Sequence, residues 1–89
     1  MRLAGSFCFR EILDEIVAIP TGEGLQKFSG IISVNQTGRF LMEALAREQT
    51  EQSLAEALLQ EFDSDPQTAA RDIREFLQLL RENDLLIED

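Results

Sequence analysis

Residues 28–41 read FSGIISVNQTGRFL, and within this stretch the pattern of apolar residues changes from that of a strand to that of a helix. Before Asn35, the side chains divide into the two alternating faces of an extended chain. After Asn35, apolar residues recur at helical spacing, and asparagine is itself favoured as the N-cap of a helix. The sequence therefore predicts a strand over about residues 28–34 that leads directly into a helix over about residues 35–48.

Two shorter strands are predicted before this point. Residues 7–12 alternate between apolar and polar side chains, which is the pattern of a half-buried strand. Residues 15–19 form a short apolar run that we expect Pro20 to end, because proline cannot donate to a strand ladder. Asp14 suits a tight turn between the two. Together with the third strand, they predict an antiparallel sheet over residues 6–34.

Two further helices are predicted in the remainder of the chain. Thr50 can cap a helix over residues 51–62, where apolar residues recur every four positions. Asp65, followed by a proline, predicts the start of a helix over residues 66–82, because aspartate accepts hydrogen bonds from unpaired amides and proline has no amide to leave unpaired. Residues 85–87 follow as a short strand or an apolar tail. The apolar side chains expected to carry the helix packing are Phe40, Leu45, Leu54, Leu58, Phe62, Ile73, Phe76 and Leu80.

This order of elements predicts an α+β fold class. A three-stranded antiparallel sheet followed by three helices fits a winged helix-turn-helix-like layout. The chain has 89 residues, of which 44% are hydrophobic, and a chain of this length can bury only one compact core. We therefore expect a single domain over residues 1–89.

The composition excludes several classes of function. The sequence has no histidine, and its one cysteine is Cys8, so an internal disulfide, a zinc or haem site and a Cys–His nucleophile are not expected. No apolar run approaches the length of about 18 residues that a membrane span needs, and the first ten residues lack the apolar segment of a secretory signal. We expect a cytoplasmic domain with no catalytic residue, no metal ligand and no cofactor.

The net charge narrows the range of partners. Eight Lys and Arg residues against 17 Asp and Glu residues give a net charge of −9 at pH 7. Nucleic acids and anionic membrane surfaces bind proteins through clustered cations, and this chain has a large excess of anions instead. We therefore expect neither a nucleic acid nor a membrane as partner.

A set of short motifs points to a known family. Residues 34–38 (VNQTG) match a hydrophobic-Asn-x-x-Gly pattern before the first helix. The other motifs are residues 9–12 (FREI), 15–23 (EIVAIPTGE), 28–38 (FSGIISVNQTG) and 72–80 (DIREFLQLL). In their order and spacing they resemble the PqqD family of stand-alone peptide chaperones, the recognition elements of ribosomally made and modified peptides. The chain departs from the family at Met42, where a tryptophan is common.

The resemblance implies a binding module without catalysis. In this family the leader segment of a precursor peptide pairs as an added strand with the third strand, its side chains lie against the third helix, and a modifying enzyme, often a radical SAM protein, receives the complex. Carried onto this chain, the strand positions that would bind the peptide are Gly30, Ile31, Ile32, Ser33 and Val34. We expect the module to be a monomer or a weak homodimer.

The third helix has two flanks beside its apolar stripe, and the peptide could lie against either. The first flank carries Ala70, Arg74, Leu77 and Arg81, a mixture that suits a peptide with an apolar anchor and an acidic residue. The opposite flank carries Asp72, Glu75, Leu79 and Glu82. We predict that the first flank contacts the peptide.

Two other functions fit the same layout. A winged-helix regulator would place the helix over residues 66–82 in a DNA groove, where Arg71, Arg74 and Arg81 are available but alternate with carboxylates. A regulatory subunit of an enzyme, without a peptide cargo, is the other alternative. A gel-shift assay would test the first, and a precursor-peptide gene beside this one would argue against the second.

Overall fold

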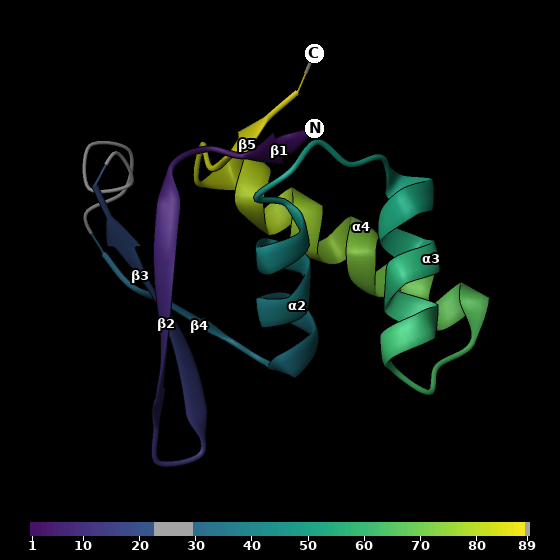
Figure 1. Ribbon diagram of the computed structural model, residues 1–89, viewed down its shortest axis with the longest axis horizontal. Helices are drawn as coiled ribbons and strands as arrows, with labels where there is room; N and C mark the ends of the chain where they lie inside the picture. The colour runs from purple at the N-terminus through teal and green to yellow at the C-terminus, as the bar shows by residue number, and fades with distance from the viewer. Residues whose placement is uncertain (23–29, 89) are drawn as a thin grey trace.

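The computed structural model describes residues 1–22 and 30–88 (Figure 1). Its elements in chain order are β1 (Arg2–Leu3), β2 (Ser6–Ile12), β3 (Glu15–Thr21), β4 (Ile32–Val34), α2 (Gln36–Ala44), α3 (Glu51–Glu61), α4 (Pro66–Glu82) and β5 (Leu86–Ile87). In Figure 1 the sheet of β2, β3 and β4 lies on one side, α3 lies on the other with α2 between them, and α4 runs across the molecule from beside α3 to β5. The predicted α+β class, with a three-stranded antiparallel sheet followed by three helices, is confirmed.

The three-stranded sheet has the order β2-β3-β4, and both of its pairings are antiparallel. The register pairs Phe9 with Ala18 and Ala18 with Ile32, so these three side chains share one face of the sheet. That face packs on the helices, because Ala18 is fully buried and Phe9 and Ile32 contact the core. The sheet therefore covers the core with one face and leaves β2 and β4 at its two edges.

Two strand boundaries differ from the sequence prediction. The strand expected over residues 28–34 extends only over Ile32–Val34; Gly30 and Ile31 precede it, and residues 28 and 29 lie outside the described residues. Pro20 was expected to end the second strand, but β3 continues to Thr21. Its last residues pair with β2 alone within the described structure, and a strand with one free side tolerates a proline that lacks the amide donor.

All three predicted helix caps are confirmed. The side chain of Asn35 accepts a hydrogen bond from the Gly38 amide at 2.8 Å, and Thr50 forms a reciprocal capping box with the residue three positions later. Asp65 accepts bonds from both the amide and the hydroxyl of Thr68, and these bonds lower the pKa of the Asp65 carboxyl from its ordinary 3.8. Each helix therefore begins where its cap residue predicts.

The helix predicted over residues 35–48 is shorter than expected. α2 ends at Ala44, and the following turn forms tighter bonds from residue i to residue i−3. Beyond α2, backbone groups form hydrogen bonds with the N-terminal segment instead. The amide of Leu3 donates to the Leu45 carbonyl at 2.8 Å, and the Gln49 amide donates to the Met1 carbonyl at 2.8 Å. Pairing with the start of the chain thus replaces the last predicted turn of the helix.

The two ends of the chain form a second, two-stranded sheet. β1 pairs with β5 in antiparallel register, Arg2 opposite Ile87 and Leu3 opposite Leu86, and Figure 1 shows the two termini side by side. β5 is the strand alternative predicted for residues 85–87, whereas β1 was not predicted. The turn before β5 closes α4, because the Leu85 amide donates to the Leu80 carbonyl at 2.8 Å.

Three aromatic residues of the predicted core are less buried than expected. Leu45, Leu54, Leu58, Ile73 and Leu80 are buried as expected. Phe40, Phe62 and Phe76 are only half-buried and pack on the margin of the core, Phe40 and Phe62 edge to face at 5.5 Å. Leu77, expected on an accessible flank, is buried to 1% exposure instead. None of the helices in the described residues is both long and apolar enough to span a membrane.

Candidate functional site

β4 offers a backbone edge for another strand. It pairs with β3 on one side, and none of the described residues pairs with its other side. A strand edge of this kind has amide and carbonyl groups available to a further chain. At 61% exposure, Ile31 lies directly before the strand and adds an accessible apolar side chain to this edge.

Gly38 brings the end of β4, the start of α2 and the middle of α4 together. A Cβ atom at this position would lie 3.1 Å from the Cε1 atom of Phe76 and 3.2 Å from the Cβ atom of Val34. The position therefore has room for a hydrogen but not for a methyl group without movement of its neighbours. Through this contact the Asn-x-x-Gly motif sets how closely α4 approaches the edge strand.

Gly38→Ala is expected to lower the melting temperature, although alanine is the better helix former by about 1 kcal/mol. The added methyl group would press on Phe76 and Val34, and overpacking of this kind costs about 1–3 kcal/mol. Thermal denaturation followed by circular dichroism measures the effect. Gln36→Ala is the control, because Gln36 is exposed in the same turn of α2 and its change should leave the melting temperature as it is. An unchanged Gly38→Ala variant would contradict the close packing.

A groove follows from this junction, between the first turns of α2 and one flank of α4. It has a volume of about 230 Å³ and is lined by Asn35, Gly38, Leu41, Asp72, Glu75, Phe76 and Leu79. We call it the helix groove. Its floor is apolar, because Leu41 is buried and Phe76 is half-buried, and Leu79 adds a side chain that is 39% exposed. The groove can hold an apolar side chain beside a carboxylate.

A second hollow lies on the other side of Asn35. It has a volume of about 320 Å³ and is lined by Glu11, Leu13, Asp14, Ile16, Val34, Asn35 and Gln36. We call it the hairpin hollow, because the turn between β2 and β3 forms one wall. Asn35 lines both hollows, so they adjoin at the end of β4.

The residues predicted to bind the peptide are not all brought together. Ile32, Ser33 and Val34 form the edge strand β4, with Gly30 and Ile31 exposed before it. Ala70 and Arg74 line a hollow against α3, together with Glu51, Gln52, Ala55 and Ile73. Leu77 is in the core, and the guanidinium of Arg81 donates to the Glu88 carboxylate at 2.8 Å beside β5. The flank of α4 that faces the end of β4 is therefore the other one, with Asp72, Glu75 and Leu79.

The sequence prediction chose the first flank for its mixture of apolar and basic side chains, and it also placed α4 in a slightly different rotation about its axis. The sequence prediction placed Phe76 in the buried stripe beside Ile73 and Leu80, whereas the observed stripe is Ala69, Ile73, Leu77 and Leu80. Burial of Leu77 turns Phe76 and Leu79 toward α2 and turns Arg74 toward α3. In the sequence, the adjacent apolar residues Phe76-Leu77 and Leu79-Leu80 indicate that the apolar surface of this helix is wider than one stripe.

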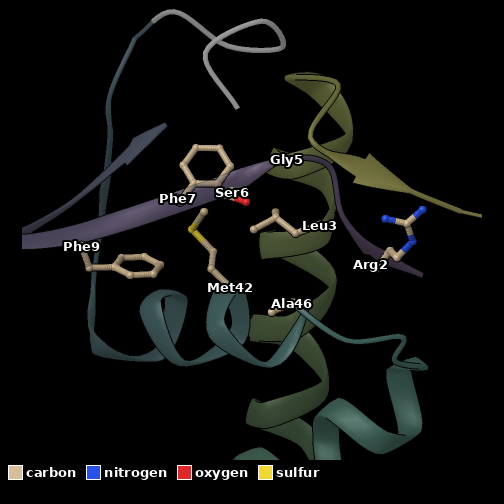
Figure 2. A pocket seen from close by; sticks show the side chains of 8 residues that line it. All are labelled: Arg2, Leu3, Gly5, Ser6, Phe7, Phe9, Met42 and Ala46. Atoms are coloured by element: carbon tan, nitrogen blue, oxygen red, sulfur yellow. The ribbon is translucent and has the colours of Figure 1, made fainter. Parts of the chain in front are cut away.

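A further hollow lies elsewhere, between β2 and α2. Its volume is about 410 Å³, and Figure 2 shows its lining residues Arg2, Leu3, Gly5, Ser6, Phe7, Phe9, Met42 and Ala46. Met42 projects from α2 toward β2 and is 1% exposed, and the guanidinium carbon of Arg39 lies 5.3 Å from the centre of the Phe9 ring. This hollow does not touch β4, so it is separate from the helix groove.

The described residues hold no cluster of three or more His, Cys, Asp or Glu side chains that could bind a metal ion. Cys8 is a free thiol at intermediate burial on β2. Within the described part of the chain, every buried side-chain nitrogen and oxygen atom has a hydrogen-bond partner.

Comparisons with known proteins agree with this geometry. The family described as coenzyme PQQ synthesis protein D (PqqD) matches residues 10–86. Among solved structures, TbiB1 in complex with the TbiA(beta) leader peptide is similar over 100% of both chains, with a TM-score of 0.69 and 23% sequence identity. That likeness shows the same fold. No curated protein matches the chain.

Proposed function

The chain belongs to the PqqD family, and from that premise we propose that it binds the leader segment of a ribosomally synthesised precursor peptide. The leader adds to the free edge of β4 as a strand and places side chains in the helix groove. The observation that carries this proposal is the juxtaposition of a strand edge that none of the described residues pairs with and an apolar groove at its end. The similar TbiB1 structure holds a leader peptide, which supports the same class of ligand.

The physical basis is strand addition to an exposed sheet edge. Main-chain hydrogen bonds to β4 supply affinity without regard to sequence, and the hollows at its end supply selectivity for particular side chains. β4 has only three residues, so it offers few such bonds, and a disordered leader must be ordered when it binds. The result is reversible binding, which suits a carrier that delivers its peptide.

The role of the bound complex is delivery and not chemistry. We propose that the module presents the leader to a peptide-modifying enzyme, which acts on the rest of the precursor. An enzyme that uses a radical SAM centre is one class of such partner. The module itself supplies a rigid strand and groove, and needs no cofactor for this role.

The geometry favours a peptide over DNA as the ligand. A recognition helix must present cations to phosphates, but the accessible flank of α4 beside β4 carries Asp72 and Glu75. Arg71 lies 3.7 Å from Asp72, and Arg81 is held by Glu88. These contacts reduce the positive charge that the helix could offer to a duplex.

The test is calorimetric titration of the purified protein with the precursor peptide encoded beside its gene, with no cofactor added. We expect saturable one-to-one binding by the leader half and none by the core half of the precursor. A gel-shift assay with mixed DNA fragments should show no complex at physiological salt. If the protein binds no precursor peptide encoded beside its gene, the proposal is wrong. A complex with DNA would instead favour a winged-helix regulator.

A further inference from the structure

Carboxylates surround the end of β4 that leads into α2. Asp72 and Glu75 line the helix groove, and Glu11 and Asp14 line the hairpin hollow that adjoins it. No Lys or Arg among the described residues lines either hollow. A peptide strand on β4 therefore meets the acidic side chains of the helix groove at this end, and the hairpin hollow adds two carboxylates on the β3 side of the same end.

Cations elsewhere compensate only part of this charge. Arg39 lies 3.8 Å from the Glu11 carboxylate, but it also lies 3.6 Å from Glu43. Arg71 lies 3.7 Å from Asp72. Asp14 and Glu75 form no ion pair with any residue in the described ranges. The junction at Asn35 thus keeps a net negative charge that a bound cation would neutralise.

The apolar part of the groove lies next to this charge. Phe76 and Leu79 line the same groove as Asp72 and Glu75, on successive turns of α4. One peptide side chain resting on Phe76 and Leu79 would bring its neighbours on the peptide close to the two carboxylates. The groove therefore favours an apolar residue with a basic residue near it in sequence.

We infer that this chain selects a leader that carries an apolar anchor and, within a few positions of it, a Lys or Arg that lies beside the Val34–Asn35 end of β4. The inference rests on the proposed function and adds the chemical class of its ligand. A basic leader is the reverse of the acidic leader that the sequence predicted. An acidic leader there would place its carboxylates against Asp72 and Glu75, and like charges in such a site weaken binding. The cations that would have attracted it, Arg74 and Arg81, face α3 and β5 instead.

The experiment uses a library of random 12-residue peptides displayed on phage, selected on the intact protein at low salt. We expect the selected peptides to combine a large apolar residue with an excess of Lys and Arg over Asp and Glu. Synthetic copies of the strongest binder are then titrated by fluorescence anisotropy. For the double variant Asp72→Asn/Glu75→Gln we expect binding about five- to twenty-fold weaker at low salt, and a flatter dependence on salt concentration.

A matched control separates this effect from a change in overall charge. Glu82→Gln removes a carboxylate from the same helix, outside both hollows, and should leave the affinity within about twofold. Selected peptides without basic residues, or an unchanged affinity of the double variant, would overturn the inference and leave the proposed function in place. Failure to select any peptide, together with no binding of the locus-encoded precursor, would overturn both.

Discussion

Leu77→Ala is expected to lower the free energy of unfolding by about 2–5 kcal/mol, because it removes a large side chain from a close-packed core. Leu77 is 1% exposed and lies in the same cluster as Leu54, Leu58 and Ile73. A domain of this size has a total stability of about 5–15 kcal/mol, so the loss is a large fraction of it. At about 4–8 °C per kcal/mol, the melting temperature should fall by at least 8 °C or so.

The neighbouring Leu79 provides the control for this prediction. It has the same side chain on the same helix but is 39% exposed at the helix groove, so Leu79→Ala should cost far less stability. Leu79→Ala should instead weaken peptide binding, because the side chain forms part of the groove. Chemical denaturation of both variants gives the comparison. If both variants lose equally little free energy of unfolding, Leu77 lies outside the core, on an accessible flank as the sequence pattern predicted.

Local signals in the sequence determined most of the fold. The caps Asn35, Thr50 and Asp65 were identified from residue type alone, and each begins its helix. A cap works through a hydrogen bond to an amide only two or three residues away, so its effect is contained in a short stretch of sequence. The alternation of apolar and polar residues that predicted β2 is likewise contained in a short stretch of sequence.

Contacts between distant segments were harder to predict. β1 and β5 have two residues each, which is too short for any periodic pattern, and they exist because the two ends of the chain pair with each other. The same pairing ends α2 early, since Leu3 and Met1 bond to the backbone beyond it. Neither contact can be predicted from the sequence of one segment alone.

The positions of the candidate site residues could be predicted only in part. The edge strand followed from its pattern and its place before Asn35, but the flank of α4 depended on the rotation of that helix. Phe76, Leu77, Leu79 and Leu80 offer two neighbouring apolar stripes, and only packing against α2 and α3 decides which stripe is buried. The sequence prediction chose the basic flank by its composition alone, and the structure places the acidic flank beside the end of β4 instead.

A proline in β4 is expected to abolish peptide binding, and its position decides whether the fold survives. In an antiparallel edge strand, successive residues direct their amides alternately toward the partner strand and toward the free edge. Of Ile32→Pro and Ser33→Pro, one therefore removes a bond to β3 and should lower the melting temperature. The other removes a donor at the free edge and should keep the fold. Its affinity for the peptide should fall by at least about tenfold, because the added strand loses a hydrogen bond and clashes with the proline ring.

Ser33→Ala and Ile32→Val are the matched controls, because they keep the amide and should bind the peptide nearly as the wild type does. Hydrogen exchange gives an independent measurement that needs no proline: the free-edge amide among residues 32–34 should become protected only when peptide is added. If the proline variant that keeps its melting temperature binds the peptide normally, and no amide in β4 gains protection, the leader does not pair with β4. The helix groove would then hold peptide side chains without an added strand, because its lining residues Phe76 and Leu79 do not depend on the amides of β4.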